Sequence, residues 1–391
     1  MSEKIRLGFI GVANMGTLNI KEFFKHDELA RVAAVCDVDE GHLAKTRDLV
    51  NEHYGDEACA VYSDFRELNR CDAIDAVVVT TPDHWHACMA IDAARCGKDV
   101  YLEKPLALTI VEGRRICEVM KETGRILQTG SQQRSMPKFR QCCELVRNGY
   151  LGDLQRIEIE LPPNNKTCEP QWSPMPVPEG FDYDFWLGPA PEAEYHEQRC
   201  HYQFRFLLDY SGGQVTNFGA HHLDIAHWAM GMDDSGPRKI SGHGEWPTSG
   251  LFTTTTKVDF RFEYDNGVEL VCKTGESKLR FIGAAGAMTV ARGKLESDPA
   301  EIAETEWKDG DIRLYQSDNH HANWLECIRT REQPVCPPEV GHRSATACHL
   351  ANIAMKLGRE LEWDPASEAF VNDDEANAMR SRPYRPPWSL D

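Results

Sequence analysis

The sequence contains 14 cysteines but no C-x-x-C pair. The cysteines are scattered, many lie inside apolar runs such as the one around Cys36, and the single adjacent pair, Cys142 and Cys143, falls in a helical stretch. Disulfide-rich domains belong to oxidising compartments, whereas unpaired cysteines pack in protein cores as small hydrophobic residues. We therefore expect free, buried thiols and a reducing, cytoplasmic environment.

Long apolar segments and an excess of positive charge are also missing. No apolar run approaches the length of a membrane span, and the start of the chain, Met1 to Ile5, lacks a signal-peptide core. The formal net charge of -19 argues against nucleic acid and anionic membranes as partners. A chain of 391 residues has room for two domains. These features are typical of a soluble intracellular enzyme.

The first 130 residues alternate between strand-like and helical segments. The strand-like runs cover residues 5–10, 31–37, 73–82, 99–102 and 125–130. The third run is rich in β-branched residues, as expected for a central strand covered on both faces. Five β-α alternations predict an α/β fold with a doubly wound parallel sheet, that is, a Rossmann domain over residues 1–130.

A glycine-rich turn follows the first strand. Its sequence is Gly11-Val12-Ala13-Asn14-Met15-Gly16, and a helical stretch begins directly after it. In this G-x-A-x-x-G pattern, Ala13 replaces the glycine that lets the backbone approach a pyrophosphate. Because alanine adds only a methyl group, the turn is a candidate dinucleotide site, and a plain strand-to-helix turn is the alternative.

Asp37 ends the second strand-like run. It follows Gly11 by about 26 residues, close to the spacing at which such folds bind the adenosine ribose. Its carboxylate can accept hydrogen bonds from both ribose hydroxyls and repels a 2′-phosphate. Neither Val38 nor Asp39 supplies an arginine that would hold this phosphate. The sequence therefore favours NAD over NADP.

The third strand-like run ends in polar residues. Thr81 and Pro82 close it, and Asp83-His84-Trp85-His86 opens the next helix. His84 and His86 resemble a metal pair, but no third ligand lies nearby. We therefore expect these residues beside the nicotinamide ribose.

Glu103-Lys104-Pro105 closes the fourth run. The proline disfavours a helical conformation at Lys104, which leaves the lysine extended beyond the strand. Ligands collect at this edge of a parallel sheet, where an ammonium can orient and polarise a substrate hydroxyl or carbonyl. A lysine in an exposed turn is the alternative.

With these motifs the chain resembles the glucose-fructose oxidoreductase, inositol dehydrogenase and rhizopine catabolism family (Gfo/Idh/MocA). The resemblance covers nearly the whole chain, including Trp186-Leu187-Gly188-Pro189 and the tail. It implies an active-site role for Lys104, with Glu103 beside the cofactor, and a second motif, G-G-G-x-x-x-D-x-G-x-H, that supplies an aspartate and a catalytic histidine. Here the motif places Asn217 at the aspartate position and keeps His221.

Residues 218–230 have helical spacing and stop at Gly231. Asn217 is then a plausible N-cap, and Asn217, His221 and Asp224 share one face of the helix. A histidine in the first turn feels the positive end of the helix dipole, which keeps it a neutral base near pH 7. His221 is therefore the candidate base beside Lys104.

The other histidines of this helix, His222 and His227, point elsewhere, and we expect them to be structural. A zinc site formed by His221, Asp224 and His227 is conceivable, but nothing else is organised around these three residues. We expect no metal.

The second domain, residues 131–391, begins with a strand-like run at 153–161 that alternates apolar and polar residues. A proline-rich excursion at 162–178 predicts a loop over the site or an oligomer contact. Asp265-Asn266-Gly267 predicts a hairpin between further strands. We expect a large, mostly antiparallel open sheet, with helix 218–230 on one face and C-terminal helices packed back beside the Rossmann domain. The resemblance implies a homodimer or homotetramer through the other face.

The segment Tyr195-His196-Glu197-Gln198-Arg199-Cys200-His201-Tyr202-Gln203-Phe204-Arg205 is dense in rings and guanidinium groups. Such a segment suits a sugar, and it also suits an ordinary polar rim. The candidate substrate contacts are His201, Tyr202, Arg205, Asn217 and His221, together with Arg134 after the fifth strand.

These motifs predict an NAD-dependent oxidoreductase acting on a sugar, polyol or glycoside. A redox-neutral, NAD-dependent glycoside hydrolase is the alternative, favoured by Asn217 in place of the aspartate. A non-catalytic nucleotide-sensing regulator is a third possibility, against which Lys104 and His221 both count.

Overall fold

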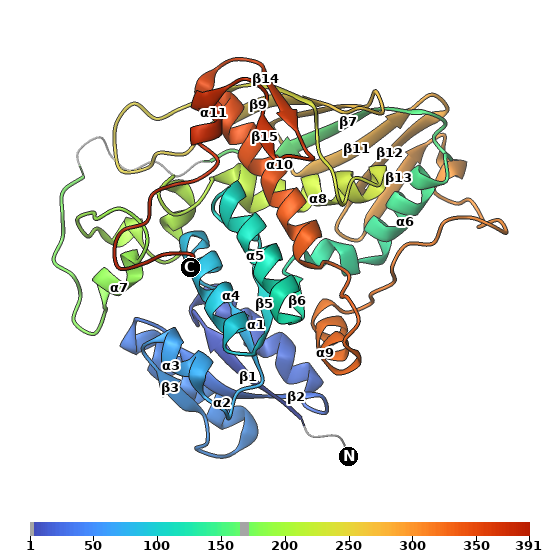
Figure 1. Cartoon of the computed structure of the whole chain (residues 1–391). Helices are drawn as coiled ribbons and strands as arrows, with labels where there is room; N and C mark the ends of the chain where they lie inside the picture. Colours follow the sequence, from blue (N-terminus) through green and yellow to red (C-terminus); the bar gives the residue numbers. More distant parts are fainter. Residues whose placement is uncertain (1–3, 165–171) are drawn as a thin grey trace.

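Two β-sheets organise the chain. The computed structural model describes residues 4–164 and 172–391, and it places a six-stranded sheet at one end and a nine-stranded sheet at the other (Figure 1). This arrangement confirms the predicted α/β fold class with a Rossmann sheet and a second, mostly antiparallel sheet. The expected start of the chain and part of the proline-rich segment 162–178 lie outside the described residues.

The six-stranded sheet has the order β3-β2-β1-β4-β5-β6, and all its neighbouring strands are parallel. Because the order reverses between β1 and β4, a crevice opens at their carboxyl ends. The third strand of the chain, β3, was not predicted from the sequence. The strands are β1 (Ile5–Ile10), β2 (Ala30–Cys36), β3 (Ala60–Tyr62), β4 (Ala76–Val79), β5 (Asp99–Leu102) and β6 (Leu127–Thr129).

Helices cover both faces of this sheet, and the buried apolar residues form one cluster on each face. Local signals define the helix starts: Asp39 caps α2 through its side chain, and Thr109 and Glu112 form a reciprocal capping box at the start of α5. The helices are α1 (Asn14–Phe23), α2 (Glu40–Tyr54), α3 (Phe65–Arg70), α4 (His86–Arg95) and α5 (Ile110–Thr123).

The nine-stranded sheet has the order β13-β12-β11-β7-β10-β9-β8-β14-β15. Its pairs are antiparallel except for β7 and β10, which run parallel. The predicted hairpin joins β9 to β10. The strands are β7 (Leu154–Leu161), β8 (Lys239–Glu245), β9 (Lys257–Glu263), β10 (Glu269–Thr274), β11 (Lys278–Gly283), β12 (Gly286–Ala291), β13 (Lys294–Asp298), β14 (Leu361–Asp364) and β15 (Ala369–Phe370).

Helices α6 (Pro137–Arg147), α8 (Ala220–Met230) and α10 (Pro338–Leu357) lie on one face of this sheet (Figure 1). Alternate residues of β9, such as Phe260 and Phe262, point into the core between sheet and helices. Burial of these side chains drives the packing that places α8, and with it His221, between the two sheets. The remaining α-helices are α7 (Tyr183–Leu187), α9 (His320–Thr330) and α11 (Asp374–Ala378).

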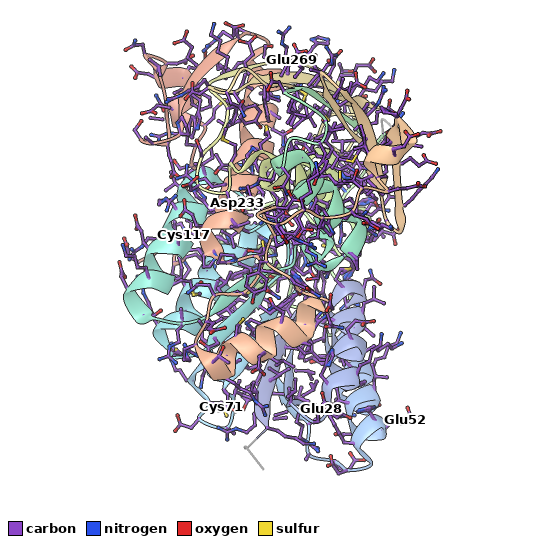
Figure 2. All side chains as sticks on the ribbon, turned by 90° about the vertical axis from the view of Figure 1, so that its right-hand side faces the viewer. Glu28, Glu52, Cys71, Cys117, Asp233 and Glu269 are labelled. Carbon is purple, nitrogen blue, oxygen red and sulfur yellow. The ribbon has the colours of Figure 1, made fainter. Side chains whose placement is uncertain are left out.

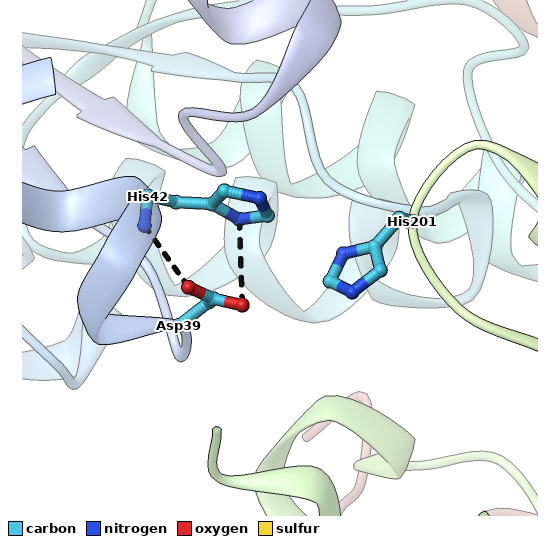
Figure 3. A group of neighbouring side chains, drawn as sticks. All are labelled: Asp39, His42 and His201. Carbon is cyan, nitrogen blue, oxygen red and sulfur yellow. Dashed lines mark hydrogen bonds and ion pairs between the residues drawn. The ribbon is translucent and has the colours of Figure 1, made fainter. Parts of the chain in front are cut away.

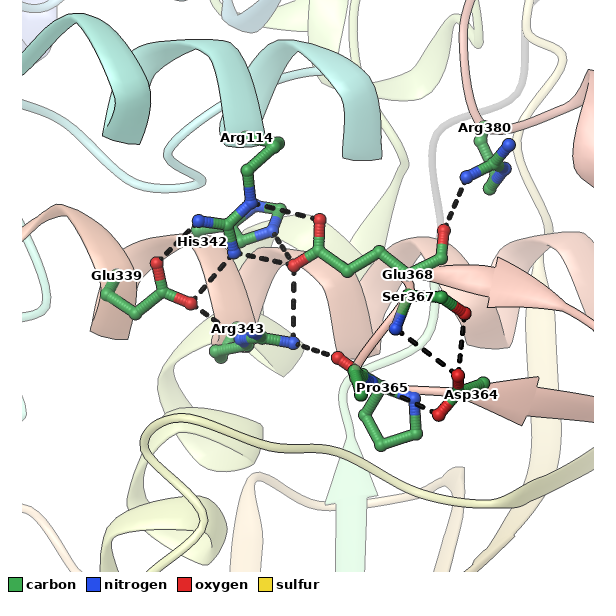
Figure 4. Close-up of polar contacts among 10 residues, drawn as sticks. Arg114, Glu339, His342, Arg343, Asp364, Pro365, Ser367, Glu368 and Arg380 are labelled. Carbon is green, nitrogen blue, oxygen red and sulfur yellow. Dashed lines mark hydrogen bonds and ion pairs between the residues drawn. The ribbon is translucent and has the colours of Figure 1, made fainter.

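C-terminal elements return to the first sheet. On α9, the Trp324 ring packs against Phe23 of α1, with ring centroids 5.7 Å apart. A charged network joins α5 to α10, because Arg114 donates to both Glu339 and Glu368 and the latter also meets His342 (Figure 4). These contacts fix the two sheets relative to each other.

The outer face of the nine-stranded sheet carries charged side chains. Glu269 on this face (Figure 2) pairs with Arg156 of β7 and Arg261 of β9, at 2.7 and 2.5 Å. None of the exposed large hydrophobic side chains among the described residues lies on strands β7 to β13. This face therefore carries ion pairs between neighbouring strands rather than an apolar surface.

All cysteines within residues 4–164 and 172–391 are free, and most of them are buried. Among the same residues, no helix combines the length and the apolarity required to span a bilayer.

Candidate active site

A cavity of about 460 Å³ opens at the carboxyl ends of β1, β4 and β5. Its volume is typical of a small-molecule site, and residues of both sheet domains form its wall. Four of the predicted site residues do not line the cavity: Gly16, His84, His86 and Arg134. The predicted site residues that do line it are Gly11, Ala13, Asn14, Met15, Asp37, Thr81, Pro82, Glu103, Lys104, His201, Tyr202, Arg205, Asn217 and His221.

The glycine-rich turn needs both of its glycines. Gly11 has a φ of +82°, and a Cβ on it would lie 2.9 Å from Thr81 Cγ2. A Cβ on Gly16 would lie 2.2 Å from the Gly11 carbonyl oxygen, so Gly16 packs α1 against the turn instead of facing the cavity. Ala13 is the N-cap of α1 and makes no side-chain cap. The first amides of α1 are therefore open to an anion.

Hydrogen bonds hold the Asp37 carboxylate in the cavity wall. Its Oδ2 accepts from the Val12 amide at 2.8 Å and its Oδ1 accepts from the Asp39 amide at 3.0 Å. Each oxygen keeps a further lone pair for a hydroxyl donor. The structure also brings His42 to this carboxylate, with Nδ1 3.8 Å from Oδ1, and the interaction with Asp37 raises the pKa of His42. His42 was not among the site residues predicted from the sequence.

Asp39, His42 and His201 form the group of described residues that is spaced to hold a metal ion (Figure 3). One ligand atom from each lies within 4.8 Å of the others. His201 comes from the far domain with a φ of +51°, and its ring lies 5.1 Å from that of His42. We did not expect this group, because it joins residues about 160 positions apart in the sequence.

Lys104 and Asn217 meet across the cavity. Lys104 Nζ donates to Asn217 Oδ1 at 3.2 Å. Burial lowers the pKa of Lys104, and the charge of Arg205 lowers it further. The charges of Glu103 and Asp83 raise it in part. The amide of Asn217 thus takes the place at which a carboxylate would form an ion pair with the lysine.

The predicted N-cap role of Asn217 is wrong. Residues Val215–Gly219 form a π-helical turn that runs directly into α8, and Asn217 lies within it. Its backbone amide is bonded to the Gly213 carbonyl at 3.0 Å, and its side-chain amide donates to Gln214. Because helical turns precede α8, His221 is not in the first turn of the helical run, and the positive end of the helix dipole does not act on it as expected.

His221 is 7% exposed and lines the cavity, and its Nδ1 has no hydrogen-bond partner among the described residues. Burial lowers its pKa well below 6.5, and Lys104 and Arg292 add to this effect. The imidazole is thus neutral at pH 7, as predicted, but burial rather than the dipole is the main cause. A neutral imidazole can accept a proton.

Asp224 and Arg134 do not join this site. Arg134 is 2% exposed and donates through Nε to Asp224 at 2.9 and 3.0 Å and through Nη2 to Asp233 at 2.6 Å. This corrects the expectation that Arg134 contacts substrate. His227 Nε2 meets the Tyr264 hydroxyl at 2.9 Å, and Asp224 is bonded to Arg134. The side chains of His221, Asp224 and His227 therefore do not converge on a zinc site. His222 meets Ser277 outside the cavity, as expected for a structural residue.

His84 and His86 are buried behind the cavity wall. His84 Nε2 bonds to the Trp186 carbonyl at 3.0 Å, and the two nitrogens of His86 meet the carbonyls of Pro105 and Thr81 at 2.7 and 3.0 Å. These contacts replace the expected position beside a nicotinamide ribose. His86 therefore links the Thr81 and Lys104 loops, whereas His84 meets the Trp186 segment of the second domain.

Asp83 and Ser211 are cavity residues that the sequence analysis did not select. Ser211 Oγ donates to Asp83 Oδ2 at 2.6 Å, and burial raises the pKa of Asp83. Since Ser211 directly precedes the glycine motif, this bond ties that motif to the first domain. Asp83 stood beside the selected histidines, whereas no sequence signal distinguished Ser211.

We expect Asn217→Asp to raise the pKa of both Lys104 and His221, because it places a carboxylate 3.2 Å from the ammonium. Both limbs of the pH profile of turnover should then move to higher pH by about one unit. Asn217→Ser removes the amide without adding a charge, and it should leave both limbs in place. An equal displacement in the serine variant would contradict this explanation.

Comparisons with known proteins agree with this fold. The chain is 24% identical over 353 residues to scyllo-inositol 2-dehydrogenase (NAD(+)) of Bacillus subtilis (strain 168), a match that covers 86% of the chain and 89% of that protein. It is 32% identical over 155 residues to glycosyl hydrolase family 109 protein 1 of Shewanella sp. (strain MR-4), covering 39% of the chain and 34% of that protein. The latter match spans about a third of the relative.

Among solved structures, the WlbA dehydrogenase from Bordetella pertussis in complex with NADH and UDP-GlcNAcA superposes with a TM-score of 0.71. It is 17% identical, and the match covers 93% of this chain and 99% of that one. Residues 5–131 match the family model described as "Oxidoreductase family, NAD-binding Rossmann fold", and residues 165–390 match "Oxidoreductase family, C-terminal alpha/beta domain". Because both domains match, the chain belongs to the Gfo/Idh/MocA family of oxidoreductases, with an N-terminal NAD-binding domain.

Proposed function

We propose that the protein is a dehydrogenase that transfers hydride between NAD and a CH–OH carbon of a sugar, polyol or glycoside. The contact that carries this proposal is Lys104 Nζ on Asn217 Oδ1, in a cavity that also holds the neutral imidazole of His221. The similarity to an inositol dehydrogenase supports a polyhydroxylated substrate.

The residues present fit NAD. The open amides at the start of α1, between Ala13 and Gly16, would hold its pyrophosphate, and the Asp37 carboxylate would accept from its adenosine ribose. Thr81, Pro82 and Glu103 would form the wall at the other half of the dinucleotide. Glu103 is fixed there by Asn19, whose amide donates to Oε1 at 3.1 Å.

NAD, when bound, supplies a site that accepts or returns a hydride. Lys104 orients and polarises the reacting hydroxyl, because its ammonium is directed by a neutral amide rather than neutralised by a carboxylate. His221 accepts the hydroxyl proton, since burial and the lysine charge keep its imidazole neutral. His201, Tyr202 and Arg205 contact the rest of the substrate.

We expect NAD to bind about tenfold or more tightly than NADP, because Asp37 accepts from ribose hydroxyls and repels a 2′-phosphate. Titration of both nucleotides at fixed salt, followed by tryptophan fluorescence, measures the ratio. Asp37→Ser should remove most of the preference, whereas Asp48→Asn on the exposed side of α2 should preserve it. Because His42 carries a raised pKa beside Asp37, NADP should gain affinity as the pH falls. Equal affinities at pH 8 would refute the role of Asp37.

A screen of sugars, polyols and glycosides tests the proposed function, with NADH absorbance and product release recorded together. Accumulation of NADH with one substrate class is the expected result. Sugar release without net NADH would instead establish the redox-neutral glycoside hydrolase, which Asn217 and the partial similarity to a glycosyl hydrolase family 109 protein favour. Nucleotide binding with neither product would indicate a regulator.

We further propose a cytoplasmic homodimer or homotetramer formed through the open face of the nine-stranded sheet. The free, buried thiols support a reducing compartment. An interface on this face would be polar, because its strands carry ion pairs such as Arg156 with Glu269. Light scattering after size exclusion should therefore show an oligomer that dissociates as salt is raised, and a monomer at low salt would contradict it.

A further inference from the structure

Two guanidinium groups line the cavity without a carboxylate partner among residues 4–164 and 172–391. Arg205 Nη1 donates to the Tyr202 carbonyl at 2.7 Å, and its guanidinium lies over the Tyr202 and Phe204 rings at 4.5 and 4.7 Å. Arg292, at the turn between β12 and β13, is exposed and makes neither a hydrogen bond nor an ion pair with any described residue. Both therefore keep donors free toward the cavity.

Unpaired arginines are unexpected in this chain, which has 62 acidic and 43 basic residues. Elsewhere an arginine such as Arg134 meets two carboxylates. The acidic residues near the cavity are already held by other donors: Asp83 by Ser211, and Glu103 by Asn19. The cavity thus combines free cationic donors with occupied carboxylates.

The charges of the two arginines act on the candidate catalytic pair, Lys104 and His221. Arg205 is among the charges that lower the pKa of Lys104, and Arg292 is among those that lower the pKa of His221. Both arginines line the cavity that holds Lys104 and His221, and they are therefore available to a substrate bound there.

We propose that the substrate carries an anionic group, a carboxylate or a phosphate, which Arg205 and Arg292 hold while its hydroxyl lies between Lys104 and His221. This inference rests on the proposed function and narrows it to sugar acids or sugar phosphates. A guanidinium presents paired donors that match the oxygens of either group. Arg205 is fixed by its rings and orients the anion, whereas Arg292 closes on it from the hairpin turn.

Calorimetry on the NAD-loaded protein tests the proposal without requiring turnover. The probes are matched neutral and anionic sugars: D-glucose, D-glucuronate and D-glucose 6-phosphate, with the corresponding galactose series. In at least one series the anionic member should bind about tenfold or more tightly than the neutral one, and its affinity should fall as salt is raised. Whether the carboxylate or the phosphate binds better identifies the anion.

Arg292→Gln and Arg205→Gln should each remove most of this preference. Lys294→Gln is the matched control, because Lys294 lies on the same hairpin, pairs with Glu296 at 2.8 Å and does not line the cavity. NAD affinity should be unchanged in all three variants. Equal binding of neutral and anionic sugars, or a preference that survives both arginine variants, would overturn the inference.

Two outcomes separate this inference from the function on which it rests. If neutral sugars are turned over to NADH as efficiently as anionic ones, the dehydrogenase stands and the anion site does not. If no probe yields NADH but the anionic preference and its loss in Arg292→Gln are measured, the anion site stands and the dehydrogenase does not. A fall in NAD affinity in Arg292→Gln would assign that arginine to the pyrophosphate and refute the proposal.

Discussion

Replacing Lys104 with alanine should lower kcat about 100-fold while the Kd for NAD changes little, since one preorganised donor is typically worth about 10²- to 10³-fold. The loss is large because Lys104 Nζ meets a neutral amide, Asn217 Oδ1, so its charge remains available for the oxygen of the reacting hydroxyl. Stopped-flow measurement of NADH formation and a nucleotide titration separate the two quantities.

The pH profile supplies the control for this result. Burial lowers the pKa of Lys104, so wild-type turnover should fall as the pH rises through that lowered value and the ammonium loses its proton. Lys104→Arg keeps the charge at every pH, and its residual activity should lack this alkaline limb. Lys121→Ala, on the exposed side of α5, should match wild type throughout. Unchanged turnover in Lys104→Ala would show that the lysine has no catalytic role.

Much of the fold could be predicted because its elements carry local signals. The buried, β-branched run at β4 and the Asp265-Asn266-Gly267 turn between β9 and β10 determine their structures with little help from the rest of the chain. Strands β3, β8, β13, β14 and β15 were not predicted, and in β3 and β15 three and two residues are too few to show a period. Pairing with β2 and β14 makes β3 and β15 strands.

The candidate site was predictable where a residue follows a strand directly. Asp37 and Lys104 both line the cavity, as expected from strand ends at one edge of a parallel sheet. Arg134 follows β6 in the same way, but Asp224 and Asp233 draw it into a buried ion-pair network. The local sequence predicts where the backbone places a side chain, whereas the residues packed around it determine which partner its charged group meets.

Some residues from the far domain carried no signal in the sequence, although His201, Tyr202 and Arg205 of the same domain were predicted and line the cavity. Arg292 reaches the cavity from a hairpin turn, and Ser211 from the segment before the glycine motif. Arg292 has no distinctive neighbour in sequence, and the glycine motif after Ser211 gave no reason to select the serine itself. The π-helical turn at Val215–Gly219 was hidden for a related reason: it contains one extra residue per turn, which displaces the i, i+4 relation of Asn217 and His221.

Replacing His221 with alanine should remove the acid limb of kcat/KM and lower turnover by about 10²- to 10⁴-fold, the usual contribution of a general base. Burial and Lys104 hold the pKa of this imidazole well below 6.5, so the wild-type limb should lie below that value. As the pH falls through the pKa, the imidazole takes up a proton and can no longer accept one from the substrate.

The control variant is His243→Ala, which removes an exposed imidazole from β8 and should leave the limb intact. Circular dichroism at each pH and NAD titration show whether both variants stay folded and loaded. If the acid limb persists in His221→Ala, the base lies elsewhere. Tyr210 cannot supply it, because burial raises its pKa to about 12. His201, whose pKa burial lowers, would then be the residue to replace, and the redox-neutral hydrolase would become the better account of the cavity.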